Sequence, residues 1–213
     1  MRALIIFFIL FHFTLASAQT VSWAWIKSNN SVGYHMDIDN SNNIYLLSSL
    51  NNSATFGTTT LNSNGSADIV ISKNDSNGNV IWAYSFGGTG SENPTAVKSD
   101  NNGDIYVTGF FSSPLLTLGS TTLTNQGGTD VFIMKLNPNG IIQWATSISG
   151  TANDKSYSID VSSNGKVAIT GSFTSSLINF GSNSYTNNSN SQDMFIAVVD
   201  DQGNPIWMKT GSG

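Results

Sequence analysis

The sequence predicts an all-β fold made of tandem copies of one unit, and three observations support this prediction. One pattern occurs three times, at Asp68–Trp82, Asp130–Trp144 and Asp193–Trp207, so the copies recur about every 60 residues. Val, Ile, Phe and Tyr gather in short runs between turns rich in Asn and Gly, which is typical of strands joined by tight turns. After residue 18, no segment places apolar residues at helical spacing.

Four strands in up-and-down order are expected in each copy. The elements of the second copy are, in order, an extended run at 95–100, a turn at 101–103, a strand at 104–111, a polar connection at 112–129, a strand at 130–136, a turn at 137–140 and a strand at 141–147. In the third strand, Val131 and Ile133 point to one side and Phe132 and Met134 to the other. Because both sides are apolar, we expect burial on both faces, inside a stack of sheets.

Glycines at one repeated position support the alignment of the copies. Gly57, Gly119 and Gly181 each follow an apolar residue and are evenly spaced, one repeat period apart. We expect this glycine to adopt a backbone angle that other residues avoid, or to let a neighbouring group approach closely.

A four-stranded unit of about 60 residues, buried on both faces and copied in tandem, is typical of a β-propeller blade. Independent β-domains of this size without disulfides would bury too little surface, and a parallel β-helix repeats over fewer residues. The prediction is therefore an all-β, partial β-propeller of three tandem four-stranded antiparallel blades, truncated before ring closure. We expect the blades at roughly 29–85, 86–147 and 148–210.

In these features the chain resembles the SBBP-type β-propeller repeat family. The Asp-x-Phe-Ile-x-Lys pattern at Asp130–Lys135, the Asn-Gly turn with Trp144 after it, and Asp104–Gly109 carry the resemblance. It extends over roughly residues 23–207. The resemblance implies an exported, cell-surface or S-layer-like protein of bacteria or archaea, many of which have further domains after the propeller.

The other two copies depart from this pattern at three positions. Ser48 stands where the second copy has a glycine, Asn74 where it has a leucine, and Val198 where it has the lysine. Because the third copy lacks the lysine, we interpret that position in the other copies as a solvated side chain.

Residues 1–18 are expected to be a signal peptide, which leaves 19–213 as the mature chain. A short basic start is followed by the apolar run Ala3–Leu15 and by Ala16-Ser17-Ala18, a small-residue cleavage site. The apolar run is too short to span a membrane, and no cysteine follows it for lipid anchoring. These features predict a secreted or cell-surface protein without a membrane span.

The chain is expected to be a fragment of a longer propeller, since propellers use about four to eight blades. Val21–Lys27 resembles a fourth strand without the first three, and we expect it to complete the last blade of the full ring. The remaining blades would then belong to the same longer chain. Alone, the three blades would leave two apolar faces uncovered, which invites association.

The composition disfavours several functions. The mature chain has no arginine, and its seven lysines face 13 acidic residues, a net charge of −6. Nucleic acid is therefore not an expected partner. There is no cysteine, and His35 is the sole histidine of the mature chain, so a His/Cys metal site is excluded. We expect His35 to be an ordinary, partly exposed strand residue and not part of a catalytic triad.

Acidic turns before the second strands raise the possibility of calcium binding. One such turn is 37–43 and another contains Asp100, Asn102 and Asp104, whereas the third, at 162–165, has no carboxylate. None has the glycine and the glutamate of a helix-loop-helix calcium site. We interpret them as turns capped by their own Asn and Asp side chains, with calcium as the lesser alternative.

Three aspartates, Asp68, Asp130 and Asp193, recur one per blade. A glycosidase needs two carboxylates about 5 to 10 Å apart, which one residue per blade does not supply. We expect each aspartate to bind turn amides at the start of its third strand. The run Gly87–Gly90 is followed by neither a helix nor a lysine, so it is not expected to bind phosphate.

The tryptophans allow two interpretations. Their indole rings could form a sugar-binding surface, or they could pack between blades, and their regular spacing favours packing. They are Trp23, Trp25, Trp82, Trp144 and Trp207.

The function expected from the sequence is a non-catalytic, exported module for binding, adhesion or scaffolding at a cell surface. Its partner is expected to be a surface glycan or a protein, and the chain shows no catalytic residues, metal site or cofactor motif. Two alternatives stay open: the propeller part of a secreted carbohydrate-active enzyme with its catalytic residues elsewhere, and a structural surface-layer protein.

Overall fold

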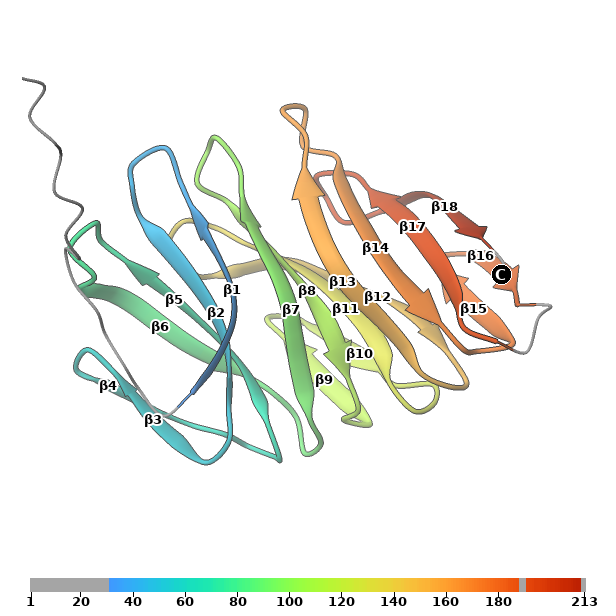
Figure 1. The fold of residues 1–213 in the computed structure, drawn as a ribbon, viewed down its shortest axis with the longest axis horizontal. Coiled ribbons are helices and arrows are strands. Elements are labelled where there is room, and N and C mark those ends of the chain that lie inside the picture. Colours follow the sequence, from blue (N-terminus) through green and yellow to red (C-terminus); the bar gives the residue numbers. More distant parts are fainter. Residues whose placement is uncertain (1–30, 188–190, 212–213) are drawn as a thin grey trace, which may run out of the picture.

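The computed structural model describes residues 31–187 and 191–211. This part of the chain forms 18 β-strands and no helix, in antiparallel sheets that follow one another along the sequence (Figure 1). The prediction of an all-β chain of three four-stranded units is confirmed. The predicted signal peptide at 1–18 and the predicted strand Val21–Lys27, with Trp23 and Trp25, lie outside the described residues.

Each blade has the same strand order, and a short hairpin follows its second strand. Blade 1 has the order β1 (Val32–Ile38), β2 (Ile44–Leu50), β5 (Asp68–Asn74), β6 (Val80–Phe86), with the hairpin β3 (Ser53–Phe56) and β4 (Thr59–Asn62). Blade 2 has β7 (Glu92–Ser99), β8 (Ile105–Phe111), β11 (Asp130–Leu136), β12 (Ile142–Gly150), with the hairpin β9 (Leu115–Leu118) and β10 (Thr121–Thr124). Blade 3 has β13 (Asp154–Val161), β14 (Val167–Phe173), β17 (Asp193–Val199), β18 (Pro205–Gly211), with the hairpin β15 (Leu177–Phe180) and β16 (Asn183–Thr186).

The blades stand side by side and pack face to face. The first strand of the middle blade, β7, lies between β1 and β13, so the three first strands are neighbours (Figure 1). The three sheets do not close into a ring within the described residues. Among the blades formed by these residues, none precedes blade 1 and none follows blade 3. In the same part of the chain, no helix has the length and apolar character needed to cross a membrane.

The third strand of the middle blade is buried on both sides, as predicted. Val131 and Ile133 belong to a core cluster with blade 3, whereas Phe132 and Met134 belong to a cluster with blade 1. We call the side of a blade that faces the next blade its forward face, and the opposite side its rear face. Val131 and Ile133 thus lie on the forward face of blade 2.

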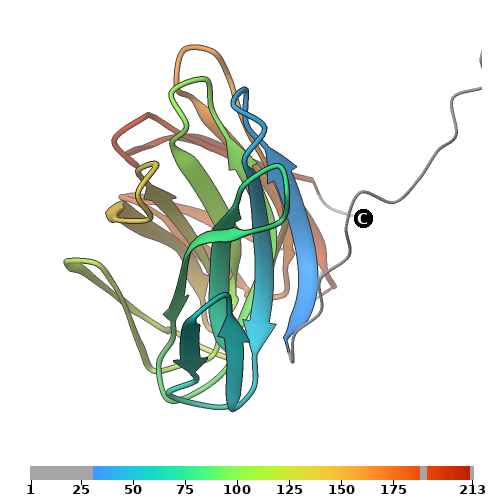
Figure 2. The same ribbon diagram turned by 90° about the vertical axis from the view of Figure 1, so that its left-hand side faces the viewer.

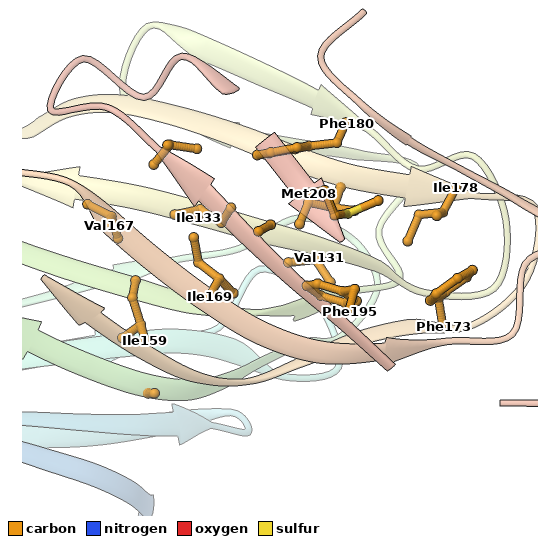
Figure 3. Close-up of a cluster of buried hydrophobic side chains, with 14 of the residues drawn as sticks. Val131, Ile133, Ile159, Val167, Ile169, Phe173, Ile178, Phe180, Phe195 and Met208 are labelled. Carbon is orange, nitrogen blue, oxygen red and sulfur yellow. The ribbon is translucent and has the colours of Figure 1, made fainter. Parts of the chain in front are cut away.

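Most of the hydrophobic core lies between the blades, and a smaller cluster lies within blade 1, where the β3–β4 hairpin contributes Ala54 and Phe56 beside Leu50 and Val70. One cluster joins blades 1 and 2 and contains Tyr45, Leu47, Ile69 and Ile71 from blade 1 together with Val97, Ile105, Val107, Phe132 and Met134 from blade 2. Figure 3 shows the cluster between blades 2 and 3, in which side chains of β11 meet side chains of β13, β14 and β17. Each blade depends on its neighbour to cover its apolar face, as in other repeat proteins.

The polar connection predicted at 112–129 is not a loop, and this corrects the sequence prediction. It contains the hairpin β9–β10, with counterparts in the other two blades. The side chains along it alternate, because Leu116, Leu118 and Leu123 are buried in the core while Thr117 and Thr122 bond to each other at the surface. The exposed threonines make this segment look uniformly polar in the sequence, so its alternation of buried and exposed side chains was not recognised. In blade 3 the hairpin also pairs with the preceding blade, since β15 extends the edge of β12.

The repeated glycine has both expected properties. Gly57, Gly119 and Gly181 form the hairpin tips with φ of 60°, 63° and 61°, a region that favours glycine. A Cβ at Gly119 would lie 3.1 Å from Cβ of Ile142, so the hairpin tip also sits close to the start of the fourth strand.

Candidate functional site

A polar groove of about 580 Å³ crosses one end of the three blades. It is built mainly from the turns between the first and second strands, so each blade contributes one turn to one surface. Its lining residues include Asn40, Lys98, Asn101, Tyr106, Lys135 and Ser163. No single repeat contains this groove, because its walls come from segments that lie one repeat period apart in the sequence.

The turns that frame the groove are held by their own first side chains, as predicted. Asp39 accepts hydrogen bonds from the amides of Ser41 and Asn43, both at 2.9 Å. Asp100 accepts from the amides two and four residues later in the same way. Ser162 accepts from the amide of Lys166 at 3.0 Å. The turns are therefore shaped by side-chain capping.

The same hydrogen bonds weigh against the calcium alternative. Both carboxylate oxygens of Asp39 are engaged, one by turn amides and the other by Asn43 and by the hydroxyl of Tyr45. Burial disfavours the charged form of Asp39, but the hydrogen bonds from Asn43 outweigh it and lower the pKa of Asp39. Within the described residues, no three His, Asp or Glu side chains gather as a metal ion would require.

The two lysines that line the groove are each paired with an aspartate. Lys98 of β7 lies 3.0 Å from Asp37 of β1, which also accepts bonds from the backbone amide and the hydroxyl of Ser99. Burial opposes ionisation of Asp37, but the hydrogen bonds from Ser99 and Lys98 outweigh it and lower the pKa of this carboxyl. The pair also ties blade 1 to blade 2.

The second ion pair corrects an expectation about the repeated lysine. Lys135 is not a freely solvated side chain. It lies 2.8 Å from Asp104, and its ammonium group is 5.2 Å from the ring centroid of the buried Tyr106. Burial alone would lower the pKa of Lys135, but hydrogen bonds to Asp104 and Tyr106 raise it, so the side chain stays charged.

His35 and the Gly87–Gly90 segment both have structural roles. His35 is an exposed residue of β1, as expected, and its Nδ1 accepts a long bond of 3.4 Å from the amide of Val97. The Gly87–Gly90 segment connects blade 1 to blade 2 and carries no helix. Its Gly90 amide donates to the hydroxyl of Ser113, which holds this connection against β8–β9.

The three recurring aspartates are buried. Asp68 and Asp130 bind turn amides, which confirms the prediction for these two. Asp68 accepts from the amide of Asn64 at 2.9 Å, and Asp130 from that of Gln126 at 2.7 Å. Asp130 also accepts from the amide of Gly150 at the end of its own blade. Asp68, Asp130 and Asp193 are at most 3% exposed, so a substrate could not reach them.

The sequence interpretation missed a second buried acid at each blade junction. Glu92 and Asp154 begin the first strands of blades 2 and 3, and both are fully buried. Each binds a hydroxyl, Glu92 that of Ser113 and Asp154 that of Ser175. A signal was present, because both acids stand four residues after a glycine and lie one repeat period apart.

Each of these acids lies near a recurring aspartate of the preceding blade. Burial, together with the charge of Asp68, raises the pKa of Glu92. Burial, together with the charge of Asp130, raises the pKa of Asp154 to about 6. These pairs resemble the paired carboxylates of hydrolases in number alone, since their complete burial leaves no access for a substrate.

The raised pKa of Asp154 predicts a chain that gains stability in mildly acidic solution. Because the folded-state pKa lies above the unfolded-state pKa of about 4, the folded chain binds this proton more tightly. Its stability should rise as the pH falls through about 6, by an amount on the order of 2 kcal/mol, and the gain should be complete near pH 4. Urea unfolding between about pH 7.5 and 5 measures this effect.

Asp154→Asn is the matched variant for this pH dependence. The amide keeps an acceptor and a donor for Ser175 but cannot titrate in this range. We expect a shallower change of unfolding free energy with pH than in the wild type. The pKa values of Asp37 and Asp39 are lowered, so the stability that these two groups contribute to the fold is lost only at lower pH, outside this window. An unaltered pH dependence in the variant would show that Asp154 does not titrate here.

Two of the tryptophans pack between blades, as the sequence analysis favoured. Trp82 of blade 1 donates from Nε1 to the carbonyl of Pro138 in blade 2 at 3.1 Å, and its ring covers Gly140 together with the ring of Tyr84. Trp144 donates to the carbonyl of Asp201 in blade 3 at 2.9 Å, and its ring covers the turn glycine two residues later. Neither indole lines the groove, so they do not form a sugar-stacking surface there.

Sequence similarity to known proteins points to a repeat architecture. No protein-family model matches the chain. An uncharacterized WD repeat-containing protein, L264, of Acanthamoeba polyphaga mimivirus is 29% identical over 122 residues, which make up 54% of this chain and 9% of that protein. This relative supports a repeat, propeller-like architecture.

A solved structure also aligns with the chain. It is a protein of unknown function from Bacteroides caccae, with 9% identity over 85% of this chain and 82% of that one, at a TM-score of 0.30. At this score the similarity supports no argument about fold or function.

Proposed function

We propose that the chain is a non-catalytic, exported module of SBBP-type propeller repeats that binds a polar surface glycan in the groove across its blades. The observation that supports this proposal is the groove itself, a hollow of about 580 Å³ lined by amide, hydroxyl and charged side chains from three blades. Loops presented by a rigid scaffold are where binding residues concentrate in many folds.

The charge of the groove disfavours an anionic ligand, because Asp39, Asp100 and Asp201 also line it. Lys98 and Lys135 are each paired with an aspartate, so neither offers an unpaired cation to a phosphate or sulfate. Side chains such as Asn40 and Asn101, which bond to each other at 3.1 Å across two turns, can exchange that bond for a hydroxyl of the ligand. A polyhydroxylated sugar matches donors and acceptors of this kind.

The groove lacks an exposed aromatic platform, because Tyr106 is fully buried. Binding would therefore depend on hydrogen bonds, whose net gain over water is small, about 1 kcal/mol each. We expect weak binding to a single glycan and useful avidity when several copies act together.

A glycan array probed with a multivalent form of the chain tests this function. Ser163→Trp would fill the groove from an exposed turn position without touching the core, and should abolish binding while the melting temperature stays unchanged. Ser120→Trp, on the exposed tip of the β9–β10 hairpin, is the matched control and should bind as the wild type does. Absence of any glycan binding, or equal binding by both variants, would refute the proposed function.

A further inference from the structure

We propose that two copies of this chain associate head to tail, with the forward face of blade 3 in one copy packed on the rear face of blade 1 in the other. The chain already contains this type of contact twice, between blades 1 and 2 and between blades 2 and 3. The two outer blades carry its two complementary halves. The proposal is independent of the glycan-binding function.

The forward face of blade 3 presents the same positions that are buried in the inner junctions. Met194 and Ile196 of β17 are 61% and 37% exposed, and Trp207 of β18 is 40% exposed. Their counterparts on the forward face of blade 2, Val131 and Ile133, are fully buried against blade 3. These exposed side chains therefore form a surface on which a further blade could pack.

The rear face of blade 1 presents the other half, and Figure 2 looks onto this blade with no blade in front of it. Met36 and Ile38 of β1 are 54% and 56% exposed. Met36 of β1 is paired with Leu46 of β2. The equivalent cross-strand pair in blade 2 is Val97 with Val107. Those two valines are fully buried against blade 1. Together with the half-buried Leu46, these exposed side chains form the apolar part of this face.

The rear face of blade 1 also has a receiving site for an indole. Gly78 has a φ of 76° and lies in the turn between the third and fourth strands, as do Gly140 and Gly203 with φ of 79° and 81°. Trp82 and Tyr84 together cover the second of these glycines, and Trp144 covers the third. A groove of about 760 Å³ lies beside Gly78 and is lined by, among others, Met36, Ile44, Leu46 and Val80. We infer that Trp207 of the second copy occupies it.

A second copy is the occupant that the geometry favours, because one chain carries both halves in the same register. The contact would continue a junction that is already established twice, including an indole over a turn glycine. The described residues of two copies would together supply six blades, within the range of about four to eight found in propellers.

One position of the proposed contact is unfavourable and makes its strength depend on salt. Asp160 on the forward face of blade 3 is equivalent in the repeat to Asp37 of blade 1, because the two residues have equivalent partners on the second strands. In the 1–2 junction Asp37 meets Lys98, whereas Asp160 would meet the Asp37 of the second copy. Salt screens this repulsion and strengthens apolar burial, so association should increase with ionic strength.

Sedimentation velocity of the purified chain over a wide range of concentration tests the proposal. We expect a dimer at high concentration whose dissociation constant falls with added salt. Ile196→Lys disables the forward face and Met36→Lys the rear face, and each should weaken association by at least about tenfold. Leu115→Lys, at a 58% exposed site on the β9–β10 hairpin, is the matched control and should dimerise normally.

Mixing the two disabled variants distinguishes head-to-tail contact from other association. Ile196→Lys keeps an intact rear face and Met36→Lys an intact forward face, so the mixture should form a one-to-one dimer although each variant alone is monomeric. Circular dichroism of each variant checks that the fold is retained. A monomeric wild type at all concentrations, or a mixture that stays monomeric, would overturn the proposal.

Discussion

Gly171→Ala should be among the most destabilising single-methyl substitutions in this chain, with a loss of about 3 kcal/mol of unfolding free energy. A Cβ at this position in β14 would collide with the carbonyl oxygen of Lys155, and it would lie 2.5 Å from Cε1 of Phe195 on the neighbouring strand. The carbonyl belongs to the backbone of β13 and cannot rotate away. Urea unfolding at constant pH measures the loss.

Two controls distinguish this steric clash from a general effect of alanine in strands: the same substitution at another glycine, and a double mutant. Gly33→Ala in β1 adds the same methyl group where the nearest atom, on Leu46, is 3.9 Å away, and should change stability by less than about 0.5 kcal/mol. In blade 1 the counterpart of Gly171 is Ser48, which faces Val70 and not phenylalanine. We therefore expect Gly171→Ala and Phe195→Val together to cost less than the sum of the two. Equal costs for Gly171→Ala and Gly33→Ala would contradict the steric explanation.

Trp144→Ala should lower the unfolding free energy by about 3 kcal/mol, at the low end of the range for a tryptophan because the indole is only partly buried. The substitution removes the ring from Gly203 and from the core cluster between blades 2 and 3. It also leaves the carbonyl of Asp201 without its 2.9 Å hydrogen bond from Nε1. Chemical unfolding measures the loss.

Trp207→Ala provides the control within the same repeat. Trp207 holds the position of Trp144 in the next blade, but no described residues form a blade beyond it and it is 40% exposed. At protein concentrations low enough to prevent association, its substitution should cost less than about 1 kcal/mol. If Trp144→Ala left stability unchanged and abolished glycan binding, the assignment of this indole to packing would be wrong.

Much of the fold could be predicted because the determining signals are local and repeated. Turn residues, alternation in the third strand and the regular repeat period can each be read directly along the sequence. The same holds for the capping role of Asp39 and Asp100, since a side chain that bonds an amide two residues later needs no tertiary context. The hairpin β9–β10 was missed because threonines on its exposed side resembled a loop.

The candidate site could not be predicted in the same way, because it exists only between blades. Asn40 and Asn101, which lie in different repeats, meet at 3.1 Å through the packing of β1 on β7. Lys135 looked solvated in the sequence because the partial burial that pairs it with Asp104 depends on the fold. Glu92 and Asp154 begin their strands like surface residues, and the preceding blade buries them.

The sequence by itself determined the four main strands of each blade, their turns and the number of blades in the described chain, because hydrogen bonding and side-chain alternation act over a few residues. The tertiary structure alone decided which turns form the groove, which acids are buried and which apolar faces stay exposed. These properties depend on how one sheet covers another, and coverage is set by packing between segments that belong to different repeats.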